Sequence, residues 1–357
     1  MTPASRENRI LTAMLSAAIM TTMLCPTTAL AAPPKSAPFD EPLGVAVSAG
    51  HVWVTNVAGN FVTELNAASG TVLRVIDATK GRFKTPVAIA VQGSHVWVVN
   101  EGVAGDARGT GSLGELNAKT GALVRIIDTK AAQFDNPIGI AVSNLRVWVT
   151  NLQTATGDGT VTSLSAQSGV VLRVIKGPAG EFDSPISVAA HGGVVWIASS
   201  GTKNYEGNGQ DTGSVTELNA ATGAVVRVIG AGSVQFDEPT AIALGAGHVW
   251  VANLYYDSIV ELNSSNGSLT RFIKSSSLNQ PLALAVSGGH VWVADFQSNA
   301  VTELNASNGS VQRVLTTDFD EPAGLALAGR RVWVTNEANN SVTELNSSNG
   351  AVLQVIK

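Results

Sequence analysis

A proline and a tryptophan recur seven times along this chain, always 11 residues apart. All seven tryptophans of the 357-residue sequence belong to this pattern, and the copies follow one another at intervals of 41 to 54 residues. A repeat of this length predicts a closed array of propeller blades. The pairs are Pro42/Trp53, Pro86/Trp97, Pro137/Trp148, Pro185/Trp196, Pro239/Trp250, Pro281/Trp292 and Pro322/Trp333.

Each copy contains four short segments of strand character. In the last copy these are "GLALA", "RVWVT", "SVTEL" and "AVLQVI", separated by Gly, Asn and Ser. We name the predicted strands A to D; their third turn carries a glycine in every copy, as a turn with positive φ requires. Val, Ile, Leu and Thr dominate and no helical periodicity competes, so the chain is predicted to be all-β.

Strand B explains the architecture. In "HVWVTN" (residues 51–56), Val52 and Val54 point to one side and Trp53 to the other, so both faces are apolar and both need cover. Radially stacked sheets provide it, because each blade lies between two neighbours. We therefore predict a seven-bladed β-propeller with four antiparallel strands per blade, closed by packing of whole blades. The propeller spans residues 39–357, with blades starting near residues 39, 83, 134, 182, 236, 279 and 319.

The N-terminal segment differs from the repeats. Arg6 and Arg9 precede the apolar run "ILTAMLSAAIMTTML", and Ala29 and Ala31 form an A-x-A cleavage site, so residues 1–31 are predicted to be a secretory signal, with 32–38 as a linker. Lipid anchoring at Cys25 is the alternative, although Leu24 is atypical before a lipoprotein cysteine. The expected mature protein is secreted, has no transmembrane segment and is a monomer. The whole chain has a net charge of −5, and removal of residues 1–31 takes away two arginines and one glutamate, so the expected net charge of the mature protein is −6. A negative net charge argues against nucleic acid as a partner.

The unit "P-x-G-x-A-x…VWVTN…VTELN…G-x-V-x-R-V-I" resembles the NHL and YVTN families of propeller repeats over residues 39–357. It is also similar to the streptogramin B lyase propellers. The second resemblance implies a His and a Glu acting with a divalent cation on the ligand face, where the D-to-A and B-to-C connections lie. It also implies Glu at the end of strand B, where this chain has mostly Asn.

The histidines depart from that pattern. All five lie in or beside the A-to-B turn, on the opposite face, and we interpret them as solvent-exposed residues at the start of strand B: His51, His95, His191, His248 and His290. Neither a nucleophile elbow nor a phosphate-binding loop is present, so catalysis is not expected and no cofactor is predicted.

Two further positions recur around the ring. Polar residues end strand B in every blade, mostly Asn; they either bond their own loops or form a ring of amides at the channel mouth, and we favour the first role. The glutamates of strand C face arginines of strand D in most blades, as Glu64 faces Arg74, and predict cross-strand ion pairs on the outer part of each blade.

Function is predicted where the repeat breaks. From the end of strand B to the strand-C glutamate or its equivalent, the chain takes 8 residues in blades 1, 5, 6 and 7, but 15, 12 and 18 in blades 2, 3 and 4. These insertions and the adjoining blade 5 loop hold all three tyrosines and several carboxylates. The candidate ligand-binding residues are Tyr205, Tyr255, Tyr256, Glu101, Asp106, Asp158, Glu206 and Asp211.

The sequence thus favours a secreted, non-enzymatic propeller that binds a ligand or protein partner through the loops of blades 2 to 5. Tolerated surface variation is the alternative explanation of the insertions. A lyase-like or other cation-dependent enzyme and a purely structural envelope component are the competing functions. A divalent cation is conceivable at the "GDG" and "GQD" segments, although neither has the spacing of a defined calcium loop.

Overall fold

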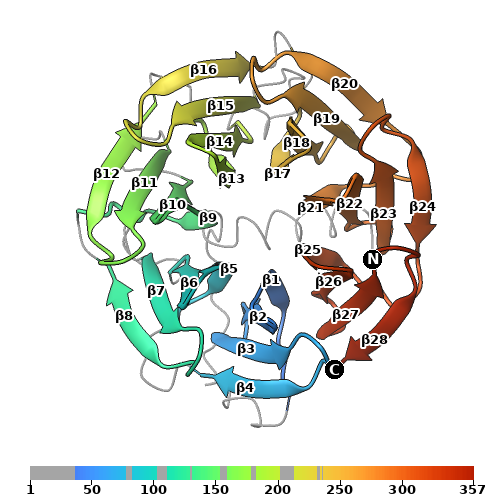
Figure 1. Ribbon diagram of the computed structural model, residues 1–357, viewed down its shortest axis with the longest axis horizontal. Helices are drawn as coiled ribbons and strands as arrows, with labels where there is room; N and C mark the ends of the chain where they lie inside the picture. Colours follow the sequence, from blue (N-terminus) through green and yellow to red (C-terminus); the bar gives the residue numbers. More distant parts are fainter. Residues whose placement is uncertain are drawn as a thin grey trace, which may run out of the picture.

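The computed structural model describes residues 37–77, 83–102, 111–128, 131–152, 159–177, 182–201, 213–230, 234 and 236–357. In these ranges the chain forms seven sheets of four consecutive antiparallel strands and no helix. The sheets stand around a central channel as the blades of a propeller (Figure 1). The predicted fold class is confirmed. The described residues include no helix that is both long and apolar enough to span a membrane.

Strand A is the innermost strand of each blade and strand B lies directly outside it (Figure 1). The A strands are β1 (Pro42–Ser48), β5 (Pro86–Gln92), β9 (Pro137–Ser143), β13 (Pro185–His191), β17 (Pro239–Gly245), β21 (Pro281–Ser287) and β25 (Pro322–Ala328). The B strands are β2 (His51–Asn56), β6 (His95–Asn100), β10 (Arg146–Asn151), β14 (Val194–Ser199), β18 (His248–Asn253), β22 (His290–Asp295) and β26 (Arg331–Asn336).

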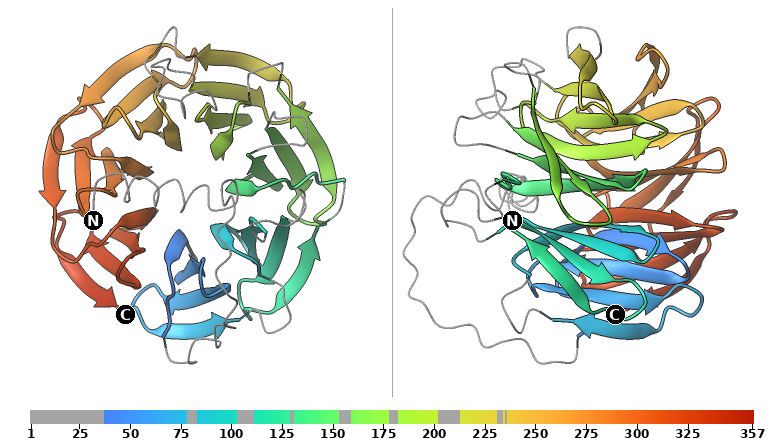
Figure 2. Two further views of the ribbon diagram at one scale, coloured as in Figure 1. Left: turned by 180° about the vertical axis from the view of Figure 1, so that it is seen from behind. Right: turned by 60° about the vertical axis from the view of Figure 1, so that its left-hand side comes forward.

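Strands C and D complete each blade, with D on the rim of the wheel (Figure 2). The C strands are β3 (Phe61–Asn66), β7 (Ser112–Asn117), β11 (Thr160–Ser165), β15 (Ser214–Asn219), β19 (Ser258–Asn263), β23 (Ala300–Asn305) and β27 (Ser341–Asn346). The D strands are β4 (Val72–Ile76), β8 (Leu123–Ile127), β12 (Val171–Lys176), β16 (Val225–Gly230), β20 (Leu269–Lys274), β24 (Val311–Leu315) and β28 (Val352–Ile356).

The tryptophan of each blade packs on the two valines, or valine and isoleucine, that flank the tryptophan of the next blade. Trp53 shares a core cluster with Val96 and Val98, and all seven indoles are at most 1% exposed. The pattern continues around the ring to Trp333, which packs in the cluster of Val52 and Val54. This explains the two-faced strand B: its indole covers the following blade, while its flanking aliphatic residues receive the indole of the preceding one.

The seam between blades 7 and 1 is closed by packing, because each of these sheets contains only its own four consecutive strands. Hydrogen bonds cross it in addition to the tryptophan contact. The Thr335 hydroxyl donates to the carbonyl of Leu43 at 2.7 Å, and the Glu41 backbone N–H donates to Asn340 Oδ1 at 2.7 Å. The covalent chain does not link β28 to β1, so these contacts hold the ring shut.

Candidate functional site

The antiparallel order of the strands sorts the connections onto two faces. The B-to-C and D-to-A connections share one face, which we call the insertion face because it receives the long loops of blades 2, 3 and 4. The A-to-B and C-to-D turns share the other, which we call the turn face. The candidate residues predicted from sequence all belong to connections of the insertion face.

In the four blades with short B-to-C connections, one side chain latches that connection to the next blade. Asn60, Asp257, Asn299 and Asn340 each stand immediately before strand C with positive φ. Their side-chain oxygens accept hydrogen bonds of 2.7 or 2.8 Å from the backbone N–H of Thr85, Gln280, Glu321 and Glu41, respectively. Each donating N–H belongs to the residue before the proline that begins strand A of the following blade.

Blades 2, 3 and 4 lack this latch and have a glycine in its place. A Cβ on Gly111, Gly159 or Gly213 would lie 2.1 to 2.6 Å from the proline ring that starts the next blade. The long loops therefore return to their blades through a close backbone approach that only glycine permits. The change from latch to glycine affects three consecutive blades, so one sector of the insertion face is built differently from the rest.

The structure describes three of the eight predicted site residues. Tyr255 and Tyr256 lie in the blade 5 connection, and Glu101 begins the blade 2 insertion. Tyr255 is 43% exposed, which is unusual for an aromatic side chain in this protein. The other five residues lie outside the described part of the chain: Asp106, Asp158, Tyr205, Glu206 and Asp211. Two of them, Asp158 and Asp211, are the aspartates of the "GDG" and "GQD" segments.

Tyr256 forms part of an aromatic and cationic cluster at the edge of blade 5. The Lys274 ammonium lies 5.8 Å from the centre of its ring, within the range of a cation–π interaction, and Phe272 meets it edge-on at 6.5 Å. Beside this cluster is a pocket of ≈ 470 Å³, lined by Asp257, Lys274, Ser275, Ser276, Leu278 and Asn279. This sector therefore presents one exposed and one half-buried tyrosine next to a polar pocket, a combination suited to binding a ligand.

Buried carboxyl groups are a second feature of the insertion face. Glu101 is 4% exposed and its Oε1 has no hydrogen-bond partner in the described chain, and burial raises its pKa to about 7. Glu238, before the proline of blade 5, is 8% exposed; burial and the adjacent Asp237 raise its pKa to about 7. Sequence reasoning identified Glu101 but missed Glu238, because "FDEP" occurs in three blades and only blade 5 buries the carboxyl.

The polar residues at the end of strand B are structural. All seven are 0% exposed, so they form no ring at the channel mouth. Asn336 is typical: its amide donates to Ser341 at 3.1 Å and to Thr343 at 2.9 Å on strand C. The Thr343 hydroxyl in turn donates to the carbonyl of Asp318 at 2.8 Å. The predicted structural role is thus confirmed, but the predicted bonds to their own loops are wrong, since the amides bond mainly to strand C.

The histidines have a role that the sequence did not reveal. In blades 1, 2, 5 and 6 the Nδ1 of the first strand-B residue lies 2.5 to 2.9 Å from the strand-C glutamate, whose second oxygen pairs with the strand-D arginine. We call each such set of histidine, glutamate and arginine a ladder. In the ladder of His51, Glu64 and Arg74 the carboxylate is 0% exposed and lies between two partners that are about one-third exposed. The interpretation of these histidines as exposed turn residues was therefore incomplete, and the predicted ion pairs are buried at the carboxylate.

The strand-D arginines also join blades on the turn face. Arg74, for example, donates to the carbonyl of Lys119 in the C-to-D turn of the next blade at 3.1 Å. Blade 7 has Gln354 at the arginine position and Arg331 at the histidine position, and Arg331 pairs with Glu344 and reaches the carbonyl of Ala68 at 3.4 Å. The exchanged residues thus preserve the contact across the seam. A signal was present in the sequence, since blade 7 alone carries Gln where the others carry Arg.

Blade 4 has Val194 in place of the ladder histidine, so Glu217 pairs only with Arg227, at 2.6 Å. Burial raises the pKa of Glu217 more than this arginine lowers it. Replacing Val194 with His should supply the missing partner and raise the free energy of unfolding at pH 7 by about 0.5–1 kcal/mol, the usual worth of a partly exposed pair. Denaturant titration would measure this, with Val194→Leu as the control. An equal effect of Leu would show that the ladder contributes only packing.

No group of three or more His, Cys, Asp or Glu side chains in the described ranges is arranged to hold a metal ion. The five histidines begin strand B or end strand A, hence at the turn face, as the sequence predicts. The carboxyls of the insertion face thus have no described histidine beside them. The lyase resemblance implies a His–Glu pair on the insertion face, and the described residues form their His–Glu pairs only with the turn-face histidines.

Comparison with known proteins supports the fold. Virginiamycin B lyase from Staphylococcus aureus, in a catalytically inactive form with quinupristin, is 18% identical over 85% of this chain and 94% of its own, with a TM-score of 0.68. Hydrazine synthase from Kuenenia stuttgartiensis is 15% identical over 91% and 99%, with a TM-score of 0.70. BamB from Moraxella catarrhalis is 16% identical over 85% of both chains, with a TM-score of 0.55.

These identities are low, so the likeness shows a shared propeller architecture and no shared activity. The structural neighbours include seven-bladed propellers of the streptogramin B lyase kind, in agreement with that part of the resemblance. No protein-family model matches the sequence, and no curated protein matches it. The similarity to NHL and YVTN repeats stays a prediction.

Proposed function

We propose that this protein is an exported, non-enzymatic binding propeller that takes a ligand or protein partner on the insertion face of blades 2 to 5. The observation that carries the proposal is the loss of the latch in three consecutive blades, where glycines and long loops replace Asn or Asp. Random variation of a rigid scaffold would spread insertions around the ring. Their concentration beside Tyr255 and the Tyr256 cluster supports one recognition sector.

Export is proposed from the N-terminal pattern of Arg6 and Arg9, an apolar run and small residues at Ala29 and Ala31. The only cysteine of the chain is Cys25, inside this segment. A propeller without cysteine needs no disulfide to fold, because the interleaved tryptophans supply the core.

The proposal can be tested by restoring the repeat. Replacing residues 102–111 with Ala-Asn-Asn gives blade 2 the connection of blade 7, "EANNS", including the latch asparagine. Partners enriched from the extracytoplasmic fraction of the source cells would first be identified with the natural protein. We expect the shortened variant to unfold at the same or higher denaturant concentration and to lose that partner.

The matched control exchanges residues 57 and 58 of blade 1 for the same Glu-Ala and keeps Gly59, where a Cβ would lie 2.1 Å from the Phe61 ring. It alters a B-to-C connection outside the recognition sector. It should bind normally. Tyr255→Ala combined with Tyr256→Ala should weaken binding about tenfold or more, the effect of removing aromatic anchors. Unchanged binding in both the blade 2 and the tyrosine variants would contradict the proposal.

A lyase-like enzyme is the second candidate, since virginiamycin B lyase shares the propeller architecture. An assay of quinupristin cleavage with and without a divalent cation separates the two functions. Cation-dependent turnover would establish the enzyme and exclude a purely binding role.

A further inference from the structure

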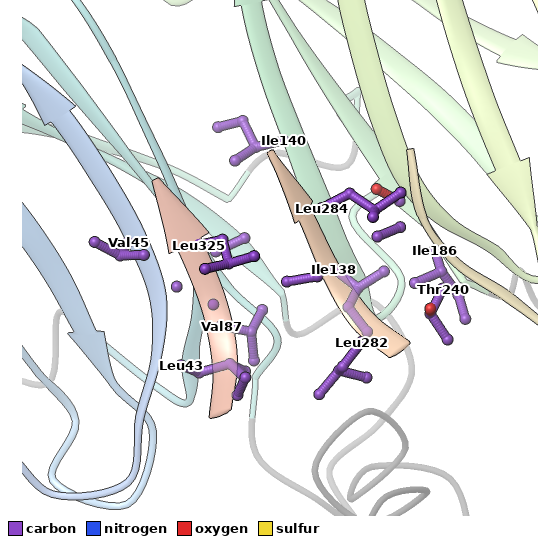
Figure 3. A pocket seen from close by; sticks show the side chains of 18 of the residues that line it. Leu43, Val45, Val87, Ile138, Ile140, Ile186, Thr240, Leu282, Leu284 and Leu325 are labelled. Atoms are coloured by element: carbon purple, nitrogen blue, oxygen red, sulfur yellow. The ribbon is translucent and has the colours of Figure 1, made fainter. Parts of the chain in front are cut away.

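The central channel has a lining that the proposed function does not use. Three successive residues from each of the seven A strands surround a cavity of ≈ 240 Å³. Figure 3 shows Leu43, Val87, Ile138, Ile186 and Leu282, from five different blades, gathered around this space. The channel is therefore a single site to which every blade contributes.

The side chains of the lining are almost all aliphatic, while backbone groups make part of its surface polar. The two outer rings of lining residues are aliphatic apart from Thr240, and the middle ring consists of Gly, Ala and Ser. Both hydroxyls are already used: Thr240 donates to the carbonyl of Pro281 at 2.9 Å, and Ser187 Oγ accepts from the Ile242 N–H at 3.2 Å. No charged side chain lines the cavity. An apolar group that displaces water from such a channel gains free energy in proportion to the area it covers.

The two mouths of this channel differ in charge. The two residues before each A strand lie on the insertion face. The first lies over the end of strand B, as the N–H groups of Asp40 and Asn279 show by donating to Asn56 and Asp295, and the second lies next to the start of strand A. Among these fourteen residues are eight carboxylates and one lysine. They are Asp40, Glu41, Lys84, Thr85, Asp135, Asn136, Asp183, Ser184, Asp237, Glu238, Asn279, Gln280, Asp320 and Glu321. The A-to-B turns at the other mouth contain no carboxylate.

The backbone holds these residues in place. The residue before each proline has a φ of +47° to +55° in all seven blades, and its carbonyl accepts a hydrogen bond of 3.0 to 3.2 Å from the start of its own B-to-C connection. Non-glycine residues rarely adopt this conformation, so the mouth is a rigid, repeated turn. Glu238 is the most buried carboxyl at this position. A buried carboxyl without a cation is a favourable place for one to bind.

We propose that the channel binds a linear apolar chain with a positively charged head, such as an alkylammonium, with the head at the insertion-face mouth and the chain among the aliphatic rings. The asymmetry of the two mouths sets the direction, and the apolar lining selects the chain.

Calorimetric titration of the purified protein with hexyl-, octyl- and decyltrimethylammonium below their micelle-forming concentrations tests this. The affinity should rise about fourfold per methylene, the effect of burying each CH₂ in an apolar site. Decyl sulfate should bind at least about tenfold more weakly, and added salt should reduce the difference. Tetramethylammonium, which has no chain, should not bind. Equal binding of the sulfate, or no dependence on chain length, would overturn the proposal.

Paired variants locate the site. Glu238→Gln with Glu321→Gln removes two carboxyl groups from the insertion-face end of the channel, and should abolish most of the preference for ammonium over sulfate at pH 8, where Glu238 is ionised. Asp128→Asn with Asp318→Asn removes the same charge from exposed positions in D-to-A connections of the same face, and should leave the preference intact. Ile140→Gln with Leu284→Gln makes the lining polar and should weaken decyltrimethylammonium about tenfold or more. Thermal unfolding of each variant confirms that it is folded.

This inference is independent of the recognition sector. The variant with the blade 2 loop shortened should keep the alkylammonium site while losing its partner. Loss of ammonium binding in that variant, with an intact fold, would contradict a site confined to the channel. If the Asp128/Asp318 variant lowered the preference for ammonium as much as the Glu238/Glu321 variant, a general attraction between charges would explain the binding, and the proposed site would be wrong.

Discussion

Replacing Trp333 with alanine should lower the free energy of unfolding by about 3–5 kcal/mol, the usual cost of removing a large aromatic side chain from a packed core. The indole is 0% exposed and packs in the same cluster as Val52, Val54 and Leu65 of blade 1. It is the only tryptophan of the described ring whose partner blade is joined to its own by no direct connection in the chain. Denaturant titration would measure the loss.

Trp250→Ala is the matched control, because Trp250 is equally buried and packs on Val291 and Val293 across an interface that the chain itself spans. Its loss of stability should be similar, but its local effects should differ. Hydrogen exchange of β1 and β28 should accelerate in the Trp333 variant well before global unfolding, whereas the Trp250 variant should show no opening at the seam. The same exchange pattern in both variants would show that the seam is no weaker than the other interfaces.

The sequence predicts the ring because its strongest pattern is also its main physical constraint. Trp53 between Val52 and Val54 requires cover on both faces, and seven copies of that requirement are satisfied by mutual packing of neighbouring blades. The structural role of the strand-B asparagines was also predictable, since a recurring polar residue at a strand end serves the local fold more often than a unique site.

Other features depend on distances that spacing does not encode. His51 lies diagonal to Glu64 across two strands, so their bond requires the actual register of the sheet. The burial of Glu238 depends on what surrounds one of seven similar turns. The apolar channel is a further case: the aliphatic residues after each proline are plain in the sequence, but their convergence around one space depends on the closed ring.

Replacing Asp295 with asparagine should stabilise the protein at pH 8 and have little effect at pH 4. Burial raises the pKa of Asp295 from 3.8 to about 7, although hydrogen bonds from the Thr302 side chain and the Asn279 N–H oppose it. A carboxyl with a higher pKa in the folded state binds its proton more tightly there. The contribution of Asp295 to the free energy of unfolding is therefore most favourable below pH 4 and is lost as the pH rises toward 7.

The chemistry of the site explains the raised pKa. In blades 3 and 7 the equivalent Asn151 and Asn336 donate an amide hydrogen to the strand-C threonine, whose own hydrogen goes to a backbone carbonyl. Ionised Asp295 has no hydrogen to give, while the Thr302 hydroxyl also lies 3.3 Å from the carbonyl of Ser277. Asp295 Oδ2 is left buried without a geometrically satisfied partner. Asparagine restores the donor and removes the buried charge.

The expected gain at pH 8 is roughly 2–4 kcal/mol, since each unit of pKa shift corresponds to about 1.4 kcal/mol. Denaturant titration at pH 4, 6 and 8 would show the difference between the variant and the natural protein growing with pH. The reverse exchange, Asn336→Asp in blade 7, should introduce the same dependence into a blade that lacks it. A gain from Asp295→Asn that is equal at all three pH values would mean that the amide packs better for reasons unrelated to charge. The single carboxyl among these seven positions would then be ordinary variation in the repeat, and the pH sensitivity of the wheel would have to come from Glu101 and Glu238 on the insertion face.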